Sequence, residues 1–279
     1  MSLPSGYKRL EYIKSSGTQY IKTGFKPNQN TKVSAVFQGN KTSDATVFGC
    51  DAGWGSNGFS VFANAAQFGS KTTSGLTFYG DTKISVIFDK GTLYKNDTQV
   101  WNTIGSFSSQ NEMTLFANNR NGSAQEFMVG KMYSFKIYDN GTLVRDFIPF
   151  QTTDGTIGLW DDVNSVFYGN AGTGTFMAGP EIIPDPPAAP TGLQTVLAVV
   201  LQWAASANAD RYDVYRDGAK LGSTEGTQYV DTTPEANQTY VYTVKAVNGG
   251  GESAGASITV YTKSGYFEYK PLIESANFP

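Results

Sequence analysis

The chain has 279 residues, of which 39% are hydrophobic and 14% aromatic, so it can bury a sizeable core and is long enough for two domains. A net charge of −3, a pI near 5.1 and the lack of any Lys/Arg cluster argue against a nucleic-acid partner. Histidine is absent, which excludes Ser-His-Asp and Cys-His catalysis and all His-ligated metal sites. The single cysteine, Cys50, cannot form an intrachain disulfide and is expected to be a small buried hydrophobe.

No targeting or membrane segment is evident. The N-terminal residues lack the apolar core of a signal peptide, and no run approaches the roughly 18 apolar residues of a membrane-spanning helix. We therefore expect no membrane insertion. The chain would be made in the cytosol and used there, assembled into a particle, or exported by a route not written in these residues.

Short segments with a period of two dominate the first half of the chain. Glycine-rich and polar turns separate them, and no helical periodicity is present. About a dozen such strands at regular spacing predict an all-β fold, an antiparallel sandwich or jelly roll. The clearest segments are 32–38, 46–50, 58–62, 76–79, 83–88, 92–95, 98–101 and 113–117.

The strongest local signal lies in residues 131–179. Tyr133, Phe135 and Ile137 alternate with polar or half-exposed neighbours, as in a half-buried strand. Asn140-Gly141 supplies the positive φ angles of a tight hairpin, and a return strand follows. Because proline cannot donate to a ladder, that strand is predicted to end at Pro149.

Three runs of the first domain are distinctive: LPSGYKRLEYIKSSGTQYIKTGFKP, ISVIFDKGTLYKND, and GKMYSFKIYDNGTLVRDFIPF with its GTIGLWDDVNSVFYGNAGTGTF ending. Together they resemble the laminin-G/concanavalin A-like sandwich family. The resemblance covers about residues 4–179. It implies a concanavalin A-like antiparallel β-sandwich (jelly roll), of the type found in tail and other virion proteins of Gram-positive phages and in bacterial surface proteins. The fold hosts lectins, protein-binding modules and glycosidases, so it leaves the function open.

A second domain follows a proline-rich stretch, residues 181–190, which predicts a stiff linker. Residues 191–262 resemble a fibronectin type III domain, a smaller Ig-like β-sandwich. Trp203 matches that family's core tryptophan, and Tyr240 its tyrosine-corner residue, whose hydroxyl bonds the upstream backbone. The predicted division is therefore 1–180, 181–190, 191–262 and a C-terminal tail, 263–279.

Candidate sugar-binding residues occupy two polar loops. Sugar sites combine an exposed aromatic face with amide or acidic groups that hydrogen-bond hydroxyls. Trp54, in the glycine-rich loop DAGWGSNG, is the best candidate platform, although it could equally serve as a structural lid. The polar candidates are Asn57, Asn118, Asn119, Arg120 and Asn121.

A calcium site is the weaker alternative. Asp161, Asp162 and Asn164 form one acidic cluster, and Asp51 lies near another turn, but neither has a defined ligand spacing. Solvated turn acids are the preferred interpretation, and no cofactor is required. The chain also lacks the Glu-x-Asp-x-x-Glu run that hydrolases of this fold place on one strand.

These observations favour a non-enzymatic adhesion protein, a tail, fibre or capsid-decoration component of a virion that recognises cell-surface glycan. The protein would be located in the virion, or alternatively on the bacterial cell surface. By analogy we expect a homo-oligomer, first of all a trimer, that contacts other virion proteins. One alternative is a purely structural decoration protein, and a less favoured one is a glycoside hydrolase. The tail supplies the candidate docking residues Tyr266, Phe267, Tyr269, Leu272 and Ile273.

Overall fold

The computed structural model describes residues 7–40, 45–196 and 200–263. Regular structure in these ranges consists of 27 strands, without a helix, which confirms the all-β prediction. No helix with the length and apolar character needed to cross a membrane occurs in these ranges. The chain separates into two compact units, the first extending to Ile182 and the second beginning at Ile183.

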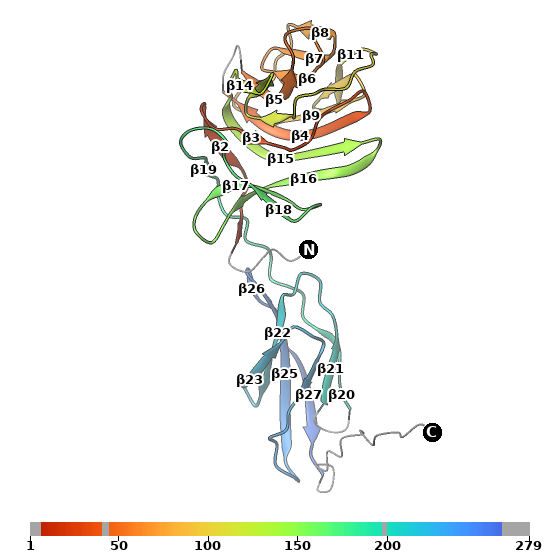
Figure 1. The fold of residues 1–279 in the computed structure, drawn as a ribbon. Coiled ribbons are helices and arrows are strands. Elements are labelled where there is room, and N and C mark those ends of the chain that lie inside the picture. The colour runs from red at the N-terminus through yellow and green to blue at the C-terminus, as the bar shows by residue number, and fades with distance from the viewer. Residues whose placement is uncertain (1–6, 41–44, 197–199, 264–279) are drawn as a thin grey trace, which may run out of the picture. The chain divides into compact units, whose positions relative to one another are not determined.

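The first unit contains two sheets, drawn in red to green in Figure 1. The large sheet has 11 strands and the small sheet has 8. The large sheet comprises β1 (Lys8–Arg9), β2 (Ile13–Ser16), β4 (Thr31–Gly39), β9 (Ile84–Asp89), β10 (Thr92–Lys95), β11 (Thr98–Asn102), β15 (Val129–Asp139), β16 (Thr142–Gln151), β17 (Ile157–Asp161), β18 (Val166–Tyr168) and β19 (Met177–Ala178). The small sheet comprises β3 (Ile21–Lys22), β5 (Thr46–Asp51), β6 (Gly58–Phe62), β7 (Ala65–Gly69), β8 (Lys71–Ser74), β12 (Thr114–Leu115), β13 (Asn118–Arg120) and β14 (Ser123–Gln125).

Aromatic side chains from both sheets form one core. In β4 every second residue is buried, so this strand presents one face to the interior. Across the interface, the rings of Phe48 and Phe135 lie 5.0 Å apart, and those of Phe59 and Phe88 lie 4.6 Å apart. Each fully buried ring of this size contributes about 1.5–3 kcal/mol through the hydrophobic effect. The predicted β-sandwich is thereby confirmed.

The hairpin of β15 and β16 matches the sequence prediction at its turn. Asn140 and Gly141 have φ of 49° and 83°, the positive angles of a two-residue hairpin loop. Two details differ. A bulge after Met132 shifts the register, so Met132 rather than Tyr133 is buried. The strand continues through Pro149, whose carbonyl accepts a hydrogen bond from the Leu10 N–H at 2.9 Å; proline loses only its donor.

The small sheet departs from simple alternation. All residues of β5, β6 and β7 are buried, so these strands are covered on both faces. The predicted loop at 118–122 is instead strand β13 followed by a turn, and β13 runs parallel to β5. This parallel pair places the polar residues of β13 beside the end of β5.

The second unit also contains two sheets. One has three strands and the other has five, with a separate core around Leu201, Trp203 and Tyr242. The Tyr240 hydroxyl accepts a hydrogen bond from the Glu235 N–H at 3.0 Å, as a tyrosine corner requires. The strands are β20 (Thr191–Val196), β21 (Val200–Ala204), β22 (Arg211–Arg216), β23 (Ala219–Thr224), β24 (Gln228–Val230), β25 (Thr239–Asn248), β26 (Gly251–Glu252) and β27 (Ala256–Tyr261).

The first two residues of the predicted linker pair with the N-terminal segment of the first unit. Glu181 forms a bridge with Leu10, and the Ile182 N–H donates to the Arg9 carbonyl at 2.8 Å. The predicted docking residues of the tail, Tyr266 to Ile273, lie outside the described residues.

Candidate functional site

The Trp54 loop, residues 52–57, connects β5 and β6. Gly53, Gly55 and Asn57 all have positive φ, which the glycines adopt without strain and which asparagine tolerates better than most residues. The loop closes on itself through the Ala52 N–H to the Ser56 carbonyl, at 3.0 Å. The Trp54 side chain is 53% exposed, and one edge packs against Phe62 with ring centroids 5.6 Å apart. An aromatic face is therefore presented on a braced loop.

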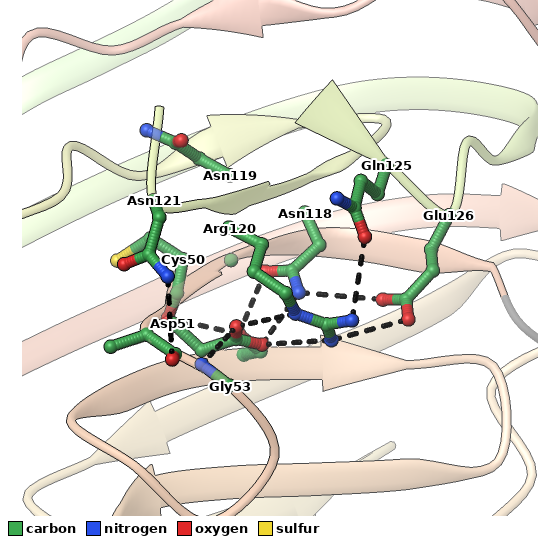
Figure 2. A network of polar contacts seen from close by, with 12 residues as sticks. Cys50, Asp51, Gly53, Asn118, Asn119, Arg120, Asn121, Gln125 and Glu126 are labelled. Atoms are coloured by element: carbon green, nitrogen blue, oxygen red, sulfur yellow. Dashed lines mark hydrogen bonds and ion pairs between the residues drawn. The ribbon is translucent and has the colours of Figure 1, made fainter. Parts of the chain in front are cut away.

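Asp51 anchors this loop to β13, as Figure 2 shows. Its carboxylate is fully buried and accepts four hydrogen bonds. Oδ1 accepts from the Gly53 N–H and from Arg120 Nε, at 2.9 and 2.8 Å. Oδ2 accepts from Asn118 Nδ2 and Arg120 Nη2, at 2.6 and 3.3 Å. The bond to Gly53 is an Asx-turn, so one side chain both shapes the loop and ties it to the sheet.

Arg120 lies between two carboxylates, with about 29% of its side chain exposed. Its Nη2 also bonds Glu126 Oε1 at 3.3 Å, and Nη1 approaches Gln125 Oε1 at 3.4 Å. The hydrogen bond to Asp51 raises the pKa of the Arg120 guanidinium, which keeps its positive charge fixed. Beside it, burial raises the pKa of the Cys50 thiol to about 12, so Cys50 is the inert buried residue that was predicted.

Two carboxylates, those of Asp51 and Glu126, share the Asn118 amide, which lies 2.6 Å from one and 3.3 Å from the other. Hydrolysis of a glycoside requires two carboxyl groups that both reach the substrate. Asp51 has no exposed surface and is already held by Arg120. The arrangement therefore serves to hold the loop.

Two of the predicted sugar-binding amides are interior. Asn118 is fully buried, and its Oδ1 accepts from the Ser60 hydroxyl at 3.4 Å. Asn119 is 6% exposed, donates to the Glu112 carbonyl and accepts from the Gly122 N–H. The prediction that they present hydrogen-bonding groups to a sugar is wrong: the two side chains point to opposite faces of β13, and both faces are covered at these positions.

The other predicted residues do reach the surface. Asn57 and Asn121 are exposed, and Arg120 is partly so. Asn121 connects the turn after β13 to the Trp54 loop. Its N–H donates to the Asp51 carbonyl at 3.3 Å, and its Nδ2 donates to the Ala52 carbonyl at 3.4 Å. The candidate site therefore consists of the Trp54 loop and the exposed polar groups of the β13–β14 hairpin.

The sequence analysis did not identify three residues that contribute to the candidate site. Asn111 donates to the Asp51 carbonyl at 2.7 Å, and Gln125 is exposed beside Arg120. Gln67 is fully buried beneath the loop, where its Nε2 approaches the Gly53 carbonyl at 3.4 Å, while its Oε1 has no hydrogen-bond partner. The separation of Asn118 and Arg120 by two residues could have signalled that they share one strand face.

Asp161, the first residue of the weaker calcium alternative, is an interior hydrogen-bond acceptor. Asp161 is fully buried, and its Oδ1 accepts from the Asp146 and Val163 N–H groups at 3.0 and 3.2 Å. Its Oδ2 accepts from the Asn164 amide nitrogen at 2.7 Å, and Arg145 Nε lies 3.5 Å away. These donors occupy the oxygens that a cation would need. Asp162 and Asn164 lie in the turn that follows β17. Within the described ranges no three His, Cys, Asp or Glu side chains group as metal ligands.

No protein-family model matches the chain. A poly(3-hydroxybutyrate) depolymerase of Ralstonia pickettii is 42% identical over 102 residues, which is 34% of this chain and 19% of that protein. An alpha-amylase of Niallia circulans is 33% identical over 125 residues, 36% of this chain and 10% of that protein. Chitinase Chi52 of Paenibacillus xylanexedens is 32% identical over 141 residues, 46% of this chain and 27% of that protein.

The chain thus spans between 10% and 27% of the length of these relatives, and their enzymatic activities do not follow for it. Among solved structures, FN3tt mut is 24% identical with a TM-score of 0.25, covering 28% of this chain and 97% of that chain. The tripod from the baseplate of bacteriophage Tuc2009 is 11% identical with a TM-score of 0.18, covering 94% of this chain and 82% of that chain. Both TM-scores are low, so neither likeness says anything about the function of this chain.

Proposed function

We propose that this chain is a non-enzymatic carbohydrate-binding protein whose first unit recognises a glycan through the Trp54 loop. One observation carries the proposal: a tryptophan that is 53% exposed on a loop held by the ion pair of the buried Asp51 with Arg120. An exposed Trp offers a large face at a low cost in conformational entropy, and a braced loop loses little freedom when a ligand binds.

The polar surroundings suit the hydroxyl groups of a sugar. Arg120, Asn121 and Gln125 have exposed or partly exposed side chains on the β13–β14 hairpin, which is bonded to the loop. Amide groups both donate and accept hydrogen bonds, as hydroxyl groups do. Binding sites of this kind combine an apolar surface with a few oriented polar groups.

The setting that we propose is a phage virion, with the bacterial cell surface as the alternative. Support comes from the laminin-G/concanavalin A-like sequence resemblance of about residues 4–179. The names of the relatives, a depolymerase, an amylase and a chitinase, refer to proteins that act on polymers, which supports a polymeric ligand. Residues 191–262 would serve as a spacer or docking module. Oligomerisation into a trimer would raise the avidity of weak single sites.

The test is binding of the full chain to a glycan array and to purified cell-wall polysaccharides of Gram-positive bacteria. We expect Trp54→Ala to weaken binding at least about ten-fold, which is about 1.4 kcal/mol. Trp54→Phe should lose less, because it keeps an aromatic face. Ile104→Ala, at a hydrophobic residue that is 85% exposed elsewhere, is the matched control and should bind as the unaltered chain does.

Two outcomes would contradict the proposal. One is a chain that binds no glycan in either format. The other is a Trp54→Ala variant with undiminished binding, which would place any sugar site elsewhere. Circular dichroism of each variant separates loss of binding from loss of fold.

A further inference from the structure

Two lysines lie opposite each other on the outer face of the large sheet. In the strand register, Lys14 of β2 is the direct partner of Lys131 of β15. Their neighbours Ile13 and Met132 are fully buried, so the two lysine side chains point to the face away from the core. Like charges directly opposite each other destabilise a sheet. Among the described residues neither lysine has an ion-pair partner, so this repulsion is not compensated there.

Two tyrosines hold the ammonium groups of this face in place and bring in a third lysine. Lys131 Nζ lies 4.4 Å from the centroid of the Tyr12 ring, and Lys83 Nζ lies 4.2 Å from that of Tyr133. The two rings contact each other edge to face, with centroids 5.4 Å apart. A cation that already rests on an aromatic face loses little freedom when an anion binds. We call Tyr12, Lys14, Lys83, Lys131 and Tyr133 the lysine–tyrosine surface.

Acidic groups balance only part of this positive charge. Glu11 Oε1 accepts a hydrogen bond from Lys83 Nζ at 2.9 Å, which pairs that lysine. The charges of Lys14 and Lys131 remain without an opposite charge in the described part of a chain whose net charge is −3. The three lysines are far apart in the sequence, and only the pairing of the strands brings them together.

We propose that the lysine–tyrosine surface binds an acidic polysaccharide, one that carries carboxylate or phosphate groups, as a site separate from the Trp54 loop. Adjacent strands are about 4.8 Å apart, so Lys14 and Lys131 can contact one anionic group or two successive ones along a polymer. The tyrosine rings and the lysine methylene groups offer apolar contact to the C–H faces of a sugar ring. The Trp54 loop belongs to the small sheet, and this second site does not depend on it.

Other anionic partners fit this surface less well. A protein interface has an apolar centre that is depleted of charge, whereas ammonium groups occupy the centre here. Duplex nucleic acid carries a charge about every 1.7 Å of its axis and is matched by a broad basic face, which three lysines do not make. Recognition of an anionic lipid surface uses clusters of about four to eight basic residues.

The test is calorimetric titration of the full chain with hexagalacturonate and with a phosphorylated mannan, which present carboxylate and phosphate groups respectively. Cellohexaose is the neutral control, and hexaglutamate is an acidic chain without sugar rings. Each titration is repeated with Trp54→Ala, so failure of the Trp54 proposal and failure of this one give different results. We expect an acidic polysaccharide to bind, to bind equally well to Trp54→Ala, and to bind more weakly as the salt concentration rises.

The variants locate the binding on the sheet. Lys14→Ala/Lys131→Ala should weaken the affinity for the acidic polysaccharide about ten-fold or more. Lys26→Ala/Lys71→Ala removes the same charge at two lysines outside the surface and should weaken it less than about two-fold. Lys14→Glu should pair with Lys131, so this variant should lose binding while its Tm rises. A higher Tm together with lost binding separates the loss from unfolding.

Four results would overturn the proposal. Neither acidic polysaccharide binds, or cellohexaose or hexaglutamate binds as tightly as they do. The double variant of Lys14 and Lys131 binds as tightly as the unaltered chain. Binding of the acidic polysaccharides disappears in Trp54→Ala, which would assign them to the Trp54 loop. Lys14→Glu keeps the full affinity.

Discussion

Asp51 connects the two halves of the candidate site at the scale of single residues. Its buried carboxylate holds the Gly53 N–H of the loop and the guanidinium of Arg120 on β13. A buried carboxylate is costly unless it is paired, and here four donors compensate its loss of hydration. The position of the Trp54 loop therefore depends on the ion pair between Asp51 and Arg120.

Replacing Arg120 by methionine should destabilise the first unit by about 3 kcal/mol, because Asp51 then remains buried without its cation. Denaturant unfolding followed by tryptophan fluorescence measures this, since Trp54, Trp101 and Trp160 all lie in the first unit. The double change Asp51→Asn/Arg120→Met removes both charges and should recover part of the loss. A single variant within about 0.5 kcal/mol of the unaltered chain would show that the pair contributes nothing.

At the scale of elements, the small sheet depends on close approach between β5 and β6. Gly49 lies opposite Ser60, and a Cβ at Gly49 would overlap the side chain and the Cα of Ser60. The Ser60 hydroxyl in turn donates to Asn118 Oδ1, so the absence of a side chain at Gly49 leaves room for the polar network beside it. This packing explains why a glycine stands in the middle of a fully buried strand.

Gly49→Ala should therefore cost about 1–3 kcal/mol of first-unit stability, through overpacking in a well-packed region. Gly105→Ala is the matched control: its Cβ would meet nothing closer than 3.8 Å, and its stability should change little. The double change Gly49→Ala/Ser60→Gly should recover part of the loss by restoring space. An unchanged denaturation midpoint for Gly49→Ala alone would refute the packing argument.

Local sequence patterns predicted individual strands and turns better than they predicted which strands pair with one another. The hairpin at Asn140-Gly141 follows from two adjacent residues, and the alternation of β4 follows from nine. The contact of Asp51 with Arg120 joins residues 69 positions apart through a parallel strand pair, for which no local pattern exists. The polarity of Asn118 and Asn119 therefore suggested a surface loop, whereas their side chains are interior hydrogen-bonding groups.

Exposure of Trp54 followed a different rule. A tryptophan flanked by glycines has no neighbouring hydrophobic periodicity to bury it, and its side chain is 53% exposed. The burial of Trp203 followed the ordinary rule, because alternation in β21 marks that residue as core, and its side chain lies in the core of the second unit.

At the scale of the whole molecule, the two units have separate hydrophobic cores and should unfold in separate transitions. The second unit carries two acids that it holds ionised. Burial alone would raise the pKa of Asp213, but hydrogen bonds from Lys220, Ser223 and Arg211 keep it below its usual value of 3.8. Burial likewise opposes ionisation of Asp231, yet the Thr233 and Tyr242 hydrogen bonds hold its pKa below 3.8.

These lowered pKa values predict acid sensitivity of the second unit. Because the unfolded chain binds protons more readily than the folded one, the stabilisation is complete above the unfolded pKa of about 3.8 and is lost as pH falls through the lower folded values. In scanning calorimetry between pH 5 and pH 2.5, the transition of the second unit should move steadily to lower temperature. Asp213→Asn/Asp231→Asn should start from a lower Tm at pH 5, since it loses ionic hydrogen bonds, and should then decline less steeply. The transition is assigned to the second unit by comparison with the change in fluorescence of Trp203, the single tryptophan of this unit. A double variant whose Tm falls as steeply as that of the unaltered chain would locate the acid sensitivity in other carboxyl groups.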